Sequence, residues 1–422
     1  MSLSYRSRLR FSATKIPKVY GFVVLVLTVT GAVKLYGEDR KYVVGTTVDF
    51  VGGGSSGQNA AGAGATDGSS RPGSFFYEVY PTIRVRSAGE HSMLDASYTF
   101  GLSRFNSDLN YNSNSQVVST KLSTSLSPKW KLNLSESFQM TSNFMTFNTT
   151  RGVTSSPEGF RFLFNPAAFN QSSQSNNATI TADYALTEKS TLSVNGSHSF
   201  LRYPEQALFR GSLSDQQRIS ESITYSQRAT EHGTWSVAYT AGYLDFQQFE
   251  NTVSHAFSGG YSHQIGPNLT VRLTAGPTYV QTLGSGPAGS YKSYNAQVTV
   301  QKLFKANMFS ANYGHDSGET SGLGSISDND RAGLSISRII GKDANLFVDV
   351  STFNARGTLG NTYSSRGVSA AASLGVPLTR ILSLQWGGQY QHYSQRSLVG
   401  FEQKRIYVSL KINAPELWRW SR

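Results

Sequence analysis

Polar and apolar residues alternate with a period of two along much of this chain. In Phe75–Arg86, apolar residues occupy every second position from Phe75 to Val85, and Glu78, Thr82 and Arg84 lie between them. The same alternation recurs in Trp235–Leu244, Val368–Val376 and Ile406–Ile412. Because successive side chains of a β-strand point to opposite faces, this pattern predicts strands with one apolar and one polar face. Beyond the N-terminal segment, almost no helical period is found.

Two kinds of connection alternate between the predicted strands. Short polar turns lie near residues 89, 128, 188, 231, 267, 305, 342 and 379, mostly at intervals of about 40 residues. Longer segments rich in Gly, Ser and Asn, such as Gly52–Ser74 and Asn148–Asn177, lie between them. Eight turns predict 16 strands, and further strands at Lys41–Val51 and Gln403–Asn413 make 18. Two strands are weakly marked, so 16 remains an alternative.

The N-terminus has the pattern of an export signal. Five basic residues without any acid precede the apolar segment Gly21–Val33, and small residues follow it. This apolar segment is short for a membrane-spanning helix and suits the core of a signal peptide. The sequence therefore predicts a signal peptide over residues 1–37, whose cleavage site stays open.

Three features favour a membrane barrel over a soluble β-sandwich. The predicted strands reach the length that crosses a bilayer, and short turns alternate with long loops through all the hairpins. Aromatic residues gather near both strand ends, as they do at the two headgroup levels of a membrane. Trp130 and Trp235 follow short turns, and near the long loops lie Tyr203, Tyr243, Tyr279, Tyr291 and Tyr313.

The predicted fold is thus all-β, a transmembrane antiparallel up-and-down β-barrel over residues 38–413. In hydrocarbon, only a closed sheet pairs every backbone N–H and C=O group of its strands. We expect short periplasmic turns, long extracellular loops and a short periplasmic tail at residues 414–422.

This pattern resembles the bacterial outer-membrane β-barrels, porin-like in size, over roughly Lys41 to Asn413. A looser resemblance is to barrels encoded in exopolysaccharide export clusters. The resemblance implies the outer membrane of a Gram-negative cell, with its lipid and lipopolysaccharide, and assembly by the barrel-assembly machinery. It also allows a homo-oligomer. In such barrels the last strand commonly ends in an aromatic residue, whereas here the predicted strand ends at Ile412 and the aromatics Trp418 and Trp420 follow in the tail.

Composition excludes several other classes. Charged residues make up only 15% of the chain, mean hydropathy is −0.31, and there is no cysteine. Apolar runs long enough for a helical membrane protein are missing, and a disulfide scaffold is excluded. The net charge of +12 comes from single basic residues spread along the chain, so we expect no nucleic-acid partner.

A barrel of 16 to 18 strands encloses a water-filled lumen, so the polar faces of the strands should line a channel. The predicted lining is mostly small and polar, with more basic than acidic residues, which predicts a mild preference for anions. The charged lining candidates are Arg84, Arg86, Lys121, Lys131, Arg218, Arg272, Arg405, Lys411, Glu78 and Asp95. The long loop Asn148–Asn177 is the candidate constriction, by resemblance to porin-like barrels, with Glu158, Phe160, Arg161, Phe162 and Phe164 as its candidate residues.

Enzyme chemistry finds little support. Gly52–Gly57 matches both a nucleophile-elbow pattern and a dinucleotide pattern, yet it lies in a Gly/Ser-rich segment without the strand–turn–helix context that either requires. No metal-ligand spacing links the seven histidines, so no cofactor and no metal site are expected.

The sequence therefore predicts an outer-membrane channel for hydrophilic solutes, either saccharides or anions. Two alternatives stay open. One is a barrel that exports an exopolysaccharide, and the other is a non-conducting structural or adhesive surface barrel.

Overall fold

The computed structural model describes residues 41–58, 74–106, 112–141, 172–204, 214–247, 250–283, 289–319, 326–341, 343–359, 364–395 and 398–421. The predicted signal peptide and all five candidate constriction residues lie outside these ranges. Among the described residues, no helix is long and apolar enough to cross a membrane.

The described residues form 18 strands, which settles the choice between 16 and 18. Their lengths run from 12 to 24 residues. The strands are β1 (Lys41–Gln58), β2 (Ser74–Ala88), β3 (Ser92–Asn106), β4 (Ser113–Ser125), β5 (Trp130–Thr141), β6 (Ser173–Ala185), β7 (Ser190–Arg202), β8 (Gln216–Arg228), β9 (Gly233–Phe246), β10 (Asn251–Ile265), β11 (Leu269–Leu283), β12 (Ser290–Phe304), β13 (Asn307–Glu319), β14 (Ile326–Ile340), β15 (Ala344–Leu359), β16 (Ser364–Pro377), β17 (Leu382–Gln395) and β18 (Leu398–Ser421).

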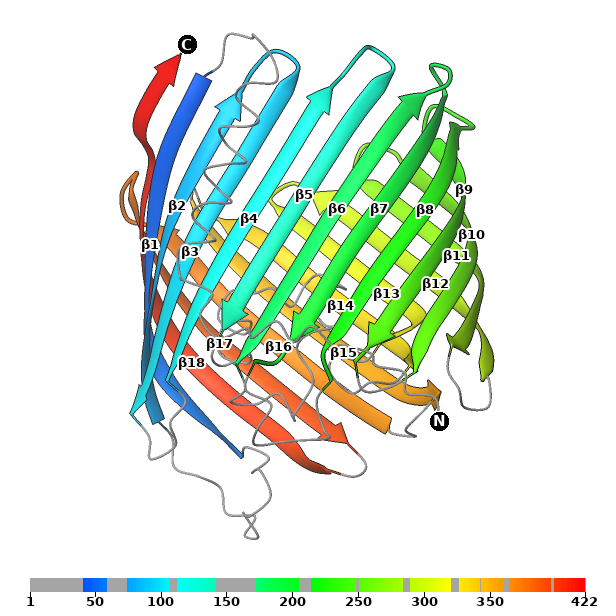
Figure 1. Ribbon diagram of the computed structural model, residues 1–422. Coiled ribbons are helices and arrows are strands. Elements are labelled where there is room, and N and C mark those ends of the chain that lie inside the picture. The colour runs from blue at the N-terminus through cyan, green and yellow to red at the C-terminus, as the bar shows by residue number, and fades with distance from the viewer. Residues whose placement is uncertain are drawn as a thin grey trace, which may run out of the picture. The chain divides into compact units, whose positions relative to one another are not determined.

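Each strand pairs antiparallel with its neighbours in sequence, and β18 pairs with β1, so the sheet closes on itself. Figure 1 shows the tilted strands, with β1 in blue beside β18 in red. Eight connections of two to four residues gather at one end, where the chain also ends. The strand bounds leave equally few residues between β9 and β10 and between β17 and β18, which are joined at the other end. Gly266 and Gly341 take positive φ angles in two of the eight turns, a conformation that only glycine adopts without strain. The all-β, up-and-down antiparallel barrel is confirmed.

The outer face of the barrel is apolar. Leu334 and Ile336 on β14 are 52% and 44% exposed, and Ile223 on β8 is 53% exposed. A soluble protein would bury such a continuous apolar surface, whereas a transmembrane barrel places it against lipid. At the short-turn end, Trp130 packs on Tyr184 with ring centroids 4.7 Å apart, as expected for an aromatic belt at the membrane interface.

Two tyrosines expected in the opposite belt lie elsewhere. Tyr203 is only 2% exposed and follows the end of β7, where its backbone N–H donates to Asp215 at 2.9 Å. Burial, together with the Asp215 carboxylate, raises the pKa of the Tyr203 phenol. Tyr291 belongs to the inner face of β12 and contacts Asp328. The belt pattern failed here because nearness to a strand end does not decide the face: alternation along β12 places Tyr291 inward and Tyr294 outward.

The closing seam between β1 and β18 depends on the glycine-rich end of β1. A Cβ atom at Gly53 would lie 2.0 Å from the carbonyl oxygen of Ile406 on β18, so only glycine allows this approach. At the other end, β18 continues beyond the predicted Asn413 to Ser421, pairing with β1 from Lys41. A register shift near Val44 accommodates this extension.

A pair of adjacent substitutions on β14 tests which face meets lipid. Leu334→Arg places a charge on the outer face and should lower the free energy of unfolding in lipid by about 2–4 kcal/mol. Ser335→Arg places the same side chain on the inner face and should have a much smaller effect. Urea unfolding in lipid vesicles measures both, and equal losses would contradict the assignment of the two faces.

Candidate functional site: the lumen of the barrel

All ten charged lining candidates lie on the inner face of the barrel. Arg84, Asp95, Lys121 and Lys411 line one cavity of about 760 Å³, bounded by β1–β4 and β15–β18. Strand pairing places the remaining six on the same face of the sheet. They are Arg86, Lys131, Arg218, Arg272, Arg405 and Glu78.

The charges around this cavity are largely paired with one another. Arg84 donates from Nε to Asp95 at 2.7 Å and also contacts its second oxygen, while Arg86 donates to Asp95 at 3.2 Å. Lys411 lies 4.0 Å from Asp49. Within the described ranges, no salt bridge involves Lys121. Pairing therefore cancels much of the excess positive charge that the sequence predicts for the lining. Among the described residues of this cavity, Lys121 is the basic side chain that keeps an unpaired positive charge.

A buried ion pair joins the two strands on either side of β1. Arg405 on β18 donates to Glu78 on β2 at 2.9 Å, and their side chains are 2% and 0% exposed. The Arg405 guanidinium also lies over the ring of Phe76, 4.0 Å from its centroid. The pair spans β1 where Gly53 lacks a side chain, so the glycine-rich segment leaves room for it. The ion pair therefore connects β18 to β2 across β1, next to the seam where the barrel closes.

The hairpin of β13 and β14 leaves the wall at the long-loop end and folds inward. Pairing between β12 and β13 ends at Ala296 and His315, whereas β13 and β14 stay paired to Glu319. Beyond this point, Ile326 packs with Leu244, Phe246 and Val280, which lie on the inner faces of β9 and β11. Ile326 therefore reaches the inner wall on strands that are not its neighbours, and the hairpin narrows this mouth of the lumen.

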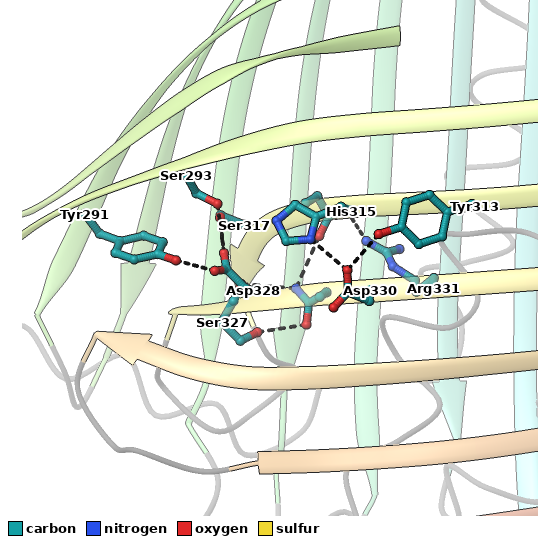
Figure 2. Close-up of polar contacts among 11 residues, drawn as sticks. Tyr291, Ser293, Tyr313, His315, Ser317, Ser327, Asp328, Asp330 and Arg331 are labelled. Atoms are coloured by element: carbon teal, nitrogen blue, oxygen red, sulfur yellow. Dashed lines mark hydrogen bonds and ion pairs between the residues drawn. The ribbon is translucent and has the colours of Figure 1, made fainter. Parts of the chain in front are cut away.

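Hydrogen bonds to the inner face of β12 hold the hairpin in this position (Figure 2). Asp328 accepts hydrogen bonds from Tyr291 and from Ser293, the latter at 3.1 Å, and also from Ser317 within the hairpin. Within the described ranges, the side-chain hydrogen bonds of Asp330 stay inside the hairpin, while the charge of Arg356 on β15 also acts on it. Tyr313 donates to it at 3.0 Å, and His315 Nδ1 lies 2.8 Å from it.

A second polar group stiffens the lumen side of the same hairpin. Arg331 pairs with Asp316, and Asn329 donates to Asp316 at 3.2 Å. Sequence reasoning missed this hairpin because residues 327–331 at the start of β14 are all polar and show no apolar alternation, so the segment reads as part of a long loop. The acid-rich run Ser327–Arg331, in an otherwise weakly charged chain, was the only signal that could have drawn attention to it.

The five candidate constriction residues lie outside the described ranges and stay a prediction. At its end the predicted loop Asn148–Asn177 was too long, because Ser173–Asn177 belongs to β6. Over the part of the chain that the structure describes, no three His, Asp or Glu side chains come together in a way that could hold a metal ion.

Comparison with known proteins gives fold neighbours only. No family model matches the chain, and no curated protein matches it. Solved structures similar to it include OccAB4 of Acinetobacter baumannii, at 11% identity and a TM-score of 0.44, covering 90% of this chain and 99% of that one. OpdL of Pseudomonas aeruginosa is 12% identical with a TM-score of 0.45, and the match covers 89% of this chain and 99% of OpdL. The siderophore receptor PirA of Acinetobacter baumannii is 7% identical with a TM-score of 0.43, and the match covers 88% of this chain and 80% of PirA. The porin-like architecture of this chain rests on its own strand pairing.

Removing one member of the buried ion pair should destabilise the barrel. Arg405→Ala leaves Glu78 charged and buried, and we expect a loss of about 3–5 kcal/mol in unfolding free energy. The double variant Glu78→Gln with Arg405→Met should recover much of this loss. Lys404→Ala, which removes an exposed neighbour on the same strand, is the matched control and should leave stability unchanged. A loss in the control as large as that of Arg405→Ala would contradict this role.

Releasing the hairpin from β12 should widen this mouth of the lumen, and an ion current recorded across a planar bilayer should change with it. Asp328→Ala removes the hydrogen bonds that reach the wall, so the open-channel current should become larger and noisier. Asp330→Ala removes only bonds within the hairpin and should leave the current close to that of the unaltered protein. Single-channel recording compares them, and equal behaviour of the two variants would argue against an anchoring role of Asp328.

Proposed function

We propose that this protein is an outer-membrane channel through which hydrophilic solutes diffuse. The observation that carries the proposal is the contrast between the two faces of one closed sheet. The outer face is apolar, and the inner face bears hydroxyl, amide and charged groups around a cavity of about 760 Å³. Barrels of 16 to 18 strands are wide enough to hold water, so a polar inner wall suits passive movement of solutes.

The inward β13–β14 hairpin favours the interpretation that the channel is narrowed at one mouth and is not a wide open pore. It covers part of the mouth at the long-loop end and is held by both hydrogen bonds and apolar packing. Residues at such a constriction decide which solutes pass, because contacts are closest there. Export through the signal peptide predicted at residues 1–37 and insertion by the barrel-assembly machinery belong to the same proposal.

Ion selectivity should be weak and should depend on Lys121. Most cations around the cavity have an acidic partner, so the field of the lumen is only mildly positive. This supports a slight preference for anions among small ions.

Planar-bilayer recording tests the channel. We expect stable ohmic current steps with a chloride-to-potassium permeability ratio somewhat above one. Lys121→Glu should bring this ratio below that of the unaltered protein, whereas Lys404→Glu, at an exposed site on the outer face, should not. The absence of steps from correctly folded protein would overturn the channel function and favour a structural or adhesive barrel.

A further inference from the structure

The inner wall around β16 forms a shallow trough. The lumen-facing residues of β16 are small, and they include Gly367, Ser369, Ala371 and Ser373. Larger side chains stand on either side, from β15 on one side and from β17 and β18 on the other. Small side chains alone do not define a binding site, so the larger side chains on either side of the trough determine which solute could bind there.

Aromatic rings and amides flank the half of the trough nearer the short turns. Phe347 on β15 and Tyr407 on β18 lie in the same row of the sheet, with Ser373 and Gly387 between them, and line the cavity of about 760 Å³. Gly387 makes room for the Tyr407 ring, since a Cβ atom at this position would lie 2.4 Å from it. Asn345, Gln385 and Gln389 line the same cavity with amide groups. Its volume falls in the range of known small-molecule sites.

The adjoining rows carry buried acceptor oxygens without a hydrogen-bond donor. Asp349 and Ser351 on β15 and Gln391 on β17 are 3%, 4% and 3% exposed. In the described part of the chain, Asp349 Oδ1, Ser351 Oγ and Gln391 Oε1 have no hydrogen-bond partner. Each buried, unsatisfied polar atom costs roughly 1–3 kcal/mol, so such a group calls for a donor from outside the wall. Asp349 lies two residues from Phe347 on the same face and pairs with Ala371, which lines the cavity.

Charge decides between the classes of solute that could supply these donors. Asp349 Oδ1 and Gln391 Oε1 only accept hydrogen bonds, so they repel the oxygens of an anion, whereas the Ser351 hydroxyl can also donate. The unpaired positive charge of Lys121 on the cavity wall disfavours a cation. A neutral molecule with many hydroxyl groups meets both conditions, because hydroxyls donate to the acceptors and carry no charge. Flat C–H faces of a sugar ring also suit the aromatic faces of Phe347 and Tyr407.

We propose that the trough along β16 is a binding subsite for a neutral, hydroxyl-rich solute of the saccharide class. The sugar ring lies against Phe347 and Tyr407, and its hydroxyl groups donate to Asp349 and Gln391. This inference rests on the proposed channel function and assigns its solute class.

Current blockade by maltotriose tests the subsite, with gluconate as an anion of similar chemistry. We expect maltotriose added to an open channel to cause concentration-dependent interruptions of the current, and to do so at lower concentration than gluconate. The double variant Phe347→Ala with Tyr407→Ala should weaken the apparent affinity about tenfold or more, and Asp349→Ala by about threefold to tenfold. Tyr407→Phe keeps the ring and should retain binding.

Asn195→Ala is the matched control. Asn195 lies on the inner face of β7, nine strands from β16 in the ring of 18, where its amide donates to Thr181 at 2.8 Å. This variant should not change the blockade. Heat-modifiable migration on gels confirms that each variant is folded.

The outcomes separate the two proposals. A protein that conducts but is not blocked by maltotriose, or is blocked more tightly by gluconate, overturns the saccharide subsite and leaves the channel intact. Equal weakening in Asn195→Ala overturns the location at β16. A folded protein that does not conduct overturns the channel itself, and isothermal titration with maltotriose then shows whether the trough binds sugar without transport.

Discussion

The structure depends on one requirement, that every backbone N–H and C=O group of a strand surrounded by hydrocarbon be hydrogen-bonded within the sheet. An open sheet would leave both edges unpaired, so the chain closes β18 onto β1. Closure in turn fixes the two faces. Because side chains alternate strictly, one face must meet lipid and the other must enclose the lumen.

Closing the sheet brings the first and last strands of the barrel into contact, and the seam combines a close backbone approach with a buried ion pair. The glycine-rich end of β1 lets β18 approach closely at Gly53. The missing side chain also allows Arg405 to reach Glu78 across β1. A motif that read as a chance match to phosphate-binding or nucleophile patterns thus has a structural reason. Glycine is needed where two backbones and a buried ion pair share limited space.

The lumen combines two unlike regions. Around the cavity between β1–β4 and β15–β18, acidic and basic side chains satisfy each other, and the orphaned acceptors lie beside aromatic rings near β16. On the other side of the lumen, the β13–β14 hairpin packs on the inner faces of β9 and β11, is hydrogen-bonded to β12, and occupies part of the mouth at the long-loop end. A solute would therefore pass between a hairpin held by Asp328 and a wall rich in neutral polar groups. This division explains why net charge, read from the sequence, is a poor guide to the local charge of the lumen wall.

Alternation along the chain determined most of the strands, their two faces and the inward position of residues such as Arg84 and Lys121, because these follow from local covalent geometry, whereas the count of 18 over 16 came from the structure. Strand ends were less certain, and β18 extends past Pro415 only because β1 offers it a partner. The tertiary structure alone decided which inward groups meet. Glu78 and Arg405 are 327 residues apart, and Asp328 finds Tyr291 only because the hairpin leaves the wall. Such contacts depend on strand register, closure and bending, which bring distant residues together and leave no periodic trace in the sequence.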